Sequence, residues 1–123
     1  MECRRMRDFM PSIIDIPVRI KSRNVLDREH WAVKRRDKKE YALLIRNQMK
    51  LNKIPDAEPK KYRLVIISIR KKLLDLDNLI GGCKHLIDAL IEENFIFDDC
   101  PEYLSLKVEQ VIGKEYKTII SRK

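Results

Sequence analysis

Two pairs of aspartates are the residues of this chain whose type and spacing could do chemistry. Asp75 and Asp77 stand two residues apart directly after an apolar segment, and Asp98 and Asp99 are adjacent further on. If residues 75–77 continue an extended chain, their side chains share one face, with Cα atoms about 6.5–7 Å apart. Two carboxylates held together repel each other, and a divalent cation relieves the repulsion. Ligands that are all oxygen favour Mg²⁺ or Mn²⁺ over zinc.

Both pairs also have a purely structural interpretation. An isolated D-x-D is typical of a solvated turn with a helix cap, and two adjacent aspartates after a helix are typical of a turn. In the metal-binding interpretation, the loop that returns from that helix to the sheet brings Asp99 towards the strand end that precedes Asp75 and Asp77. A third carboxylate then joins the first two, and the sequence leaves the two interpretations open.

Lys84 is the single basic residue in an acidic segment. Residues 73–102 contain eight acids and this one base, for a local charge of −7, whereas the whole chain has a net charge of +8. In one interpretation Lys84 contacts a scissile phosphate or stabilises developing negative charge. In the other it forms a surface ion pair with Asp88, four residues on, worth only tenths of a kcal/mol.

The rest of the chain is strongly basic, which favours polyanionic partners and makes nucleic acid the leading partner class. Clusters of Lys and Arg at residues 34–39, 60–61 and 70–72 are expected to contact DNA phosphates. The candidate DNA-binding residues are Lys34, Arg35, Arg36, Lys38, Lys39, Arg70, Lys71 and Lys72. Trp31 is interpreted as a core or interface anchor, with base stacking as the alternative.

Length and composition exclude several classes of protein. A chain of 123 residues is expected to form a single domain over residues 1–123, with residues 1–12 as a flexible N-terminal tail. No apolar run approaches the ~20 residues of a membrane-spanning helix, and no secretory signal is recognisable. Three cysteines are an odd number without paired spacing, so neither a disulfide framework nor a zinc site is expected. The expected environment is the reducing cytosol.

The periodicity of apolar residues predicts an α/β (α+β) fold, a small mixed β-sheet of about four strands with two main helices. Alternation predicts a first strand at residues 14–20, and a dense β-branched segment predicts a central strand at residues 62–69. Helical spacing predicts helices at residues 28–50 and 83–93. Two further strands at residues 104–108 and 116–120 complete the order β-α-β-α-β-β.

Several of these segments together resemble a known family. They are D-L-D-N-L at 75–79, K-x-x-x-D-A-L at 84–90, F-x-x-D-D at 95–99 and I-P-V-R-I at 16–20, followed by Asn24, His30-Trp31 and the basic run at 35–39. In this order they resemble the RusA family of Holliday junction resolvases, found in bacteria, phages and prophages. The resemblance covers residues 13 to 112.

The resemblance implies a homodimeric endonuclease that uses Mg²⁺, with Mn²⁺ as a substitute, to cut four-way DNA junctions by paired symmetric nicks in recombination and repair. Carried over by position, the metal ligands are Asp75, Asp77 and Asp99, and Lys84 joins them as a catalytic residue. Asp88 matches as a helper or a structural residue. The expected compartment is the cytoplasm of a bacterium or of a phage-infected host cell.

One departure from the family pattern concerns the lysine. In the shorter family form it lies four residues after the second motif aspartate, whereas Lys84 lies seven after Asp77, so three extra residues around Gly81-Gly82 must be accommodated. Two other functions remain open. The chain could be a non-catalytic nucleic-acid-binding module, or a nuclease that acts mainly on forks or flaps.

Overall fold

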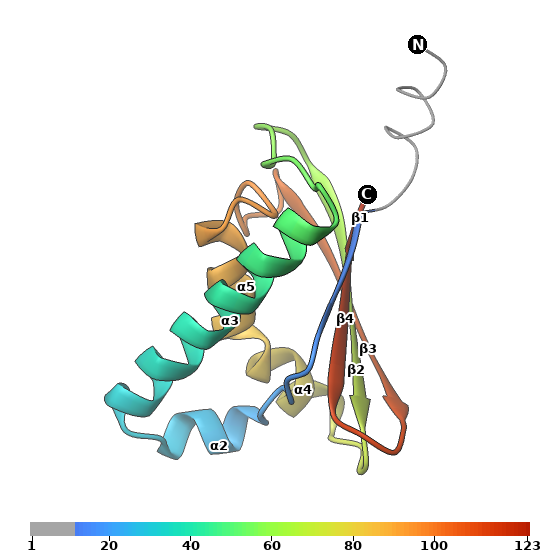
Figure 1. Ribbon diagram of the computed structural model, residues 1–123. Coiled ribbons are helices and arrows are strands. Elements are labelled where there is room, and N and C mark those ends of the chain that lie inside the picture. Colours follow the sequence, from blue (N-terminus) through green and yellow to red (C-terminus); the bar gives the residue numbers. More distant parts are fainter. Residues whose placement is uncertain (1–11) are drawn as a thin grey trace.

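The computed structural model describes residues 12–123 as a four-stranded sheet with helices on one face (Figure 1). The strands lie in the order β1-β4-β2-β3. Strand β4 is antiparallel to both β1 and β2, and β2 is parallel to β3. The strands are β1 (Ser12–Ile16), β2 (Tyr62–Arg70), β3 (Leu104–Ile112) and β4 (Lys117–Arg122). The helices are α2 (Arg23–Arg28), α3 (Trp31–Leu51), α4 (Leu76–Gly82) and α5 (Lys84–Glu92). The predicted fold class, a small mixed sheet with two main helices, is confirmed.

Alternating burial along β2 explains why the helices cover only one face. Leu64 and Ile66 are fully buried beneath the helices, while Val65 and Ile67, which point to the other face, are partly exposed. Period-two alternation places side chains of one parity on one face of a sheet. The longest helix, α3, contributes Ile45 to the same core. The core therefore lies between the sheet and the helical layer formed mainly by α3 and α5.

The predicted helix at residues 28–50 corresponds to α3, which begins three residues later, and the short helix α2 that precedes it was not predicted. Ser22 caps α2 through a hydrogen bond from the Val25 N–H, and the His30 side chain accepts the Ala32 N–H at the start of α3. The Lys21 ammonium lies 2.6 Å from the carboxylates of both Glu29 and Asp37. It therefore links the segment between α2 and α3, where Glu29 lies, to the first turns of α3. Side-chain caps satisfy backbone N–H groups that a helix start leaves free.

Helix α4 was not predicted, because residues 75–77 were expected to continue the extended chain after β2. In the structure both glycines end α4, and Gly82 is buried against the preceding segment. A Cβ atom at Gly82 would lie 1.9 Å from the carbonyl oxygen of Lys21. The glycine is therefore required by the close approach of α4 to that backbone, a tertiary contact that local sequence does not reveal.

The first strand and Trp31, both on the N-terminal side of the chain, differ from the prediction. Strand β1 ends at Ile16, because Pro17 follows, although Ile20 is still buried in the core. Trp31 is 65 % exposed and lies against His30 at the start of α3, so it is not a core residue, and its roles as an interface anchor or in base stacking stay predictions. The tail expected at residues 1–12 lies outside the described residues except for Ser12, which belongs to β1. In the described range, no helix is long and apolar enough to cross a membrane.

Candidate functional site

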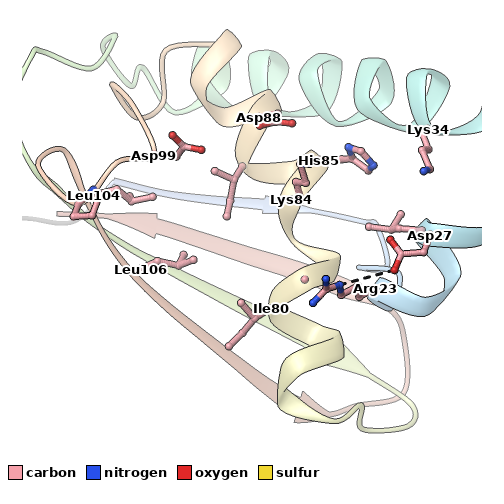
Figure 2. A pocket seen from close by; sticks show the side chains of 14 residues that line it. Arg23, Asp27, Lys34, Ile80, Lys84, His85, Asp88, Asp99, Leu104 and Leu106 are labelled. Carbon is pink, nitrogen blue, oxygen red and sulfur yellow. Dashed lines mark ion pairs between the residues drawn. The ribbon is translucent and has the colours of Figure 1, made fainter. Parts of the chain in front are cut away.

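A pocket of about 560 Å³ opens between α2, the α4–α5 region and the start of β3 (Figure 2). Its size falls within the range of small-ligand sites. Asp99 and Leu104 lie at one end, and Arg23, Asp27 and Lys34 lie at the other. The remaining lining residues combine an apolar surface with charged side chains from α5: Leu26, Ile80, Gly81, Lys84, His85, Ile87, Asp88, Pro101 and Leu106.

The two adjacent aspartates have different roles. The Asp98 side chain accepts a hydrogen bond from the Asp99 backbone N–H at 2.7 Å, which is the turn chemistry expected of such a pair. Asp99 is exposed and lines the pocket. Of the two, Asp99 is therefore the one that lines the pocket, and it is also the one that the family resemblance selects.

Lys84 and Asp88 both line the pocket, but they do not form the surface pair that was the structural alternative. Asp88 instead lies 3.7 Å from the ammonium of Lys38 on α3, which also approaches Glu92 at 3.8 Å. In the part of the chain that the structure describes, Lys84 has no ion-pair partner. It begins α5 as an exposed side chain, so its ammonium is available to a ligand.

His85 is a pocket residue that the sequence analysis did not select. Burial lowers its pKa below the ordinary value, and the ammonium groups of Lys34, Lys38 and Lys84 lower it further, while Asp88 opposes them. The imidazole is therefore mostly neutral at pH 7. Arg23 and Asp27 were also missed as site residues. They form an ion pair of 3.9 Å at the pocket rim, and only the tertiary packing of α2 against α4 brings them there.

Asp75 and Asp77 do not line this pocket, and they do not share the face of an extended strand. Asp75 occupies the N-cap position of α4, and Asp77 lies in the first turn of that helix. Residues two apart diverge around a helix, so the expected side-by-side arrangement is wrong. The Asp75 side chain accepts no capping hydrogen bond, and both residues are exposed, which leaves their carboxylates available to other groups.

The two parts of the expected metal site lie at opposite ends of the sheet. The side chain of Gln110, late in β3, hydrogen-bonds the backbone N–H and C=O of Leu74 at 2.9 and 2.7 Å and so fixes the start of α4 there. Asp99 precedes Leu104, the first residue of β3. Gln110 lies six residues after Leu104 along the strand, a distance of roughly 20 Å at about 3.3 Å per residue.

A single chain therefore does not fit the expected magnesium site. Ligand oxygens must lie about 2.0–2.1 Å from Mg²⁺, and aspartates anchored roughly 20 Å apart cannot both reach one ion. Within residues 12–123, no three His, Cys, Asp or Glu side chains are grouped so that they could hold a metal. The structure brings Lys84, Asp88 and Asp99 together around one pocket and leaves Asp75 and Asp77 outside it.

No family model matches the chain, and no curated protein does.

The basic residues of α3 form a surface that adjoins the pocket, because Lys34 lines the pocket and Lys38 pairs with Asp88. Arg35, Arg36 and Lys39 are exposed on this helix, and Lys34 and Lys38 are half-buried beside them. Such a row of guanidinium and ammonium groups suits the phosphates of a nucleic acid. Its position on the helical layer puts it on the same side of the sheet as the pocket.

Arg70 is a correction to the proposed set of DNA-binding residues. It is only 5 % exposed, and its guanidinium donates to the carbonyl oxygens of Ile20 and Lys72 and to the Ser68 hydroxyl. Burial lowers the pKa of this group. Arg70 is therefore a structural residue, whereas its neighbours Lys71 and Lys72 are exposed.

Proposed function

We propose that the chain is an Mg²⁺-dependent, structure-specific endodeoxyribonuclease of the RusA type, acting as a homodimer on four-way DNA junctions in recombination and repair. Two symmetric nicks require two sites of matching polarity, which a two-fold dimer supplies. This function belongs in the cytoplasm of a bacterium or of a phage-infected cell, where such junctions form.

The observation that carries the proposal is that three residues from the segments that resemble the RusA family line the same pocket. Lys84 and Asp88 come from the K-x-x-x-D-A-L segment, and Asp99 comes from F-x-x-D-D. Both segments belong to the set that resembles the RusA family. The basic surface of α3 gives the same protein a means to hold DNA.

The runner-up is a non-catalytic nucleic-acid-binding module. It is favoured by the separation of Asp75 and Asp77 from Asp99 within one chain. A nuclease that prefers forks or flaps is a third candidate, since the choice among branched substrates depends on dimer geometry. Both nucleases and binding modules bind DNA in a salt-sensitive way, so cleavage is the property that separates them.

The deciding measurement is cleavage of a labelled synthetic four-way junction with Mg²⁺. We expect paired nicks at symmetric positions in two opposite strands, no nicking when EDTA replaces the metal, and little cleavage of a linear duplex of the same sequence. Fork and flap substrates run in parallel test the third candidate. Absence of metal-dependent nicking on every branched substrate, by a protein that still binds DNA, would support the binding module and contradict the nuclease.

DNA binding by the α3 surface can be tested separately from cleavage. Arg35→Ala is expected to weaken junction binding and to reduce the slope of log K against log salt by about 0.9, because one phosphate contact is lost. Lys50→Ala is the matched control, since it removes one positive charge from an exposed position at the other end of the same helix. Fluorescence anisotropy across a salt series measures both. If the two substitutions weaken junction binding and reduce the salt slope equally, net charge and not the α3 surface would account for DNA binding.

A further inference from the structure

Two lysines without ion-pair partners line the pocket. Lys34 from α3 and Lys84 from α5 form no ion pair in the described part of the chain, whereas the third cation of the pocket, Arg23, lies 3.9 Å from Asp27. Burial lowers the pKa of His85 and both ammonium groups lower it further, so they lie near the same imidazole. Two cations that no carboxylate of the described chain pairs with favour an anionic group as their ligand.

The carboxylates that line the pocket do not neutralise this end. Asp88 lies 3.7 Å from the ammonium of Lys38, and the third acid is already paired at the rim. Asp99 lies at the opposite end of the pocket from Lys34 (Figure 2). An anionic group is therefore attracted to the lysine end and repelled from the aspartate end. The charges give a bound anion one place in the pocket.

An apolar wall formed by Ile80, Leu104 and Leu106 lies beside these charges (Figure 2). Leu106 pairs with the buried Leu64 in the sheet, so its side chain points to the helical face. It is nevertheless 38 % exposed, and Ile80 on α4 is 44 % exposed, because both border the pocket. Apolar side chains in a concave site pack against the flat ring of a ligand.

A nucleotide combines the two groups that this pocket fits, a phosphate and a flat ring. A volume of about 560 Å³ suits one such unit and not a duplex. The bases of a duplex are stacked, so a base reaches the apolar wall only after it has left the stack. Pockets in proteins that act on DNA hold such bases, and the cost of turning a base out is lowest where it is unpaired. Lys34 also belongs to the basic surface of α3, so a strand held there continues into the pocket.

We propose that the pocket binds one unpaired nucleotide of a DNA strand, with its phosphate between Lys34 and Lys84 and its base against the apolar wall. At a four-way junction this nucleotide is one that has turned out of the stack at the branch point. The subsite deepens the proposed function and rests on it for the identity of the strand as branched DNA. Filling the pocket requires no cleavage, so binding without metal tests the subsite separately from the nuclease.

Binding of free nucleotides tests the pocket directly. Deoxyadenosine 5′-monophosphate, inorganic phosphate and deoxyadenosine are each titrated into the full chain without metal, and the imidazole proton signals are followed by NMR. The chain has two histidines, of which His85 lines the pocket and His30 does not, and His85→Gln assigns the signals. We expect the monophosphate to shift the His85 signal and to bind at least about tenfold more tightly than either fragment, because it fills both parts of the site. An unshifted His85 signal, or fragments that bind as tightly as the monophosphate, would overturn the subsite.

Two substitutions with matched controls locate the phosphate and the base. Lys34→Met is expected to weaken binding of the monophosphate about tenfold, and Lys50→Met, at the other end of α3, is expected to leave it unchanged. Leu106→Ala is expected to weaken it about fivefold through lost apolar contact. Val111→Ala is its control, because Val111 is exposed on the opposite face of the same strand. If each substitution acts no more strongly than its control, the nucleotide binds outside the pocket and the proposal is wrong.

Fluorescence of 2-aminopurine tests whether a base leaves the stack when the protein binds a junction. This adenine analogue is quenched inside a stack and emits strongly outside it. Placed at the branch point of a four-way junction in EDTA, it is expected to brighten several-fold on binding, whereas the same analogue well inside an arm is expected to stay dim. A bound junction that stays dim at the branch point would overturn the turned-out nucleotide. A protein that passes these binding tests but nicks no branched DNA with Mg²⁺ would keep the subsite and contradict the nuclease.

Discussion

Asp75→Asn is expected to reduce metal-dependent nicking of a four-way junction by at least ~100-fold while leaving the protein folded and able to bind the junction. Asparagine has nearly the same size as aspartate and is an equally good N-cap residue, so α4 should keep its start. The substitution removes one negative charge, so junction binding is expected to be unchanged or slightly tighter. Rates under single-turnover conditions, together with anisotropy for binding, separate the two effects.

Asp98→Asn is the matched control for this prediction. It removes the same charge from the same acidic segment, and its side-chain oxygen can still accept the Asp99 N–H. The Asp98→Asn protein is therefore expected to cleave like the parent. If Asp75→Asn cleaves as fast as the parent, the assignment of Asp75 is wrong even if the activity is real. Loss of activity in Asp98→Asn with retention in Asp99→Asn would reverse the roles of the adjacent pair.

The parts of the fold that could be predicted are those whose signal is local and repeated. Strand β2 was predicted to within one residue, because β-branched residues fill it and its burial alternates. Helix α5 was predicted to within one residue at each end from Leu86, Ile87, Leu90 and Ile91. Helix α4 has seven residues and two glycines, so its local preference is weak, and its packing at Gly82 decides its conformation.

The candidate site was predictable in part for the same reason. The turn chemistry of Asp98 and the position of Lys84 at a helix start follow from neighbouring residues. The distance from Asp75 to Asp99 depends on the parallel pairing of β2 with β3, which places the end of one strand and the start of the next at opposite ends of the sheet. Spacing along the sequence contains no information on that distance, so the expected cluster required the tertiary structure to test it.

Arg70→Met is expected to destabilise the protein by about 3 kcal/mol, because it leaves the buried carbonyl oxygen of Ile20 and the partly buried carbonyl oxygen of Lys72 without this donor. The alternation of β2 already placed Arg70 in phase with the buried Leu64 and Ile66, a signal that the adjacent lysines obscured.

Lys72→Met is the control for Arg70→Met, since it also replaces a basic residue by methionine, at an exposed position nearby. It is expected to change the free energy of unfolding by less than about 0.5 kcal/mol and to weaken DNA binding. Urea unfolding followed by circular dichroism measures stability, and anisotropy measures binding. An Arg70→Met protein with the parent's unfolding midpoint and weakened DNA binding would return Arg70 to the DNA-contacting surface. The opposite pattern would assign it to the junction of β2 with the segment before α2, where its guanidinium holds the two backbones together.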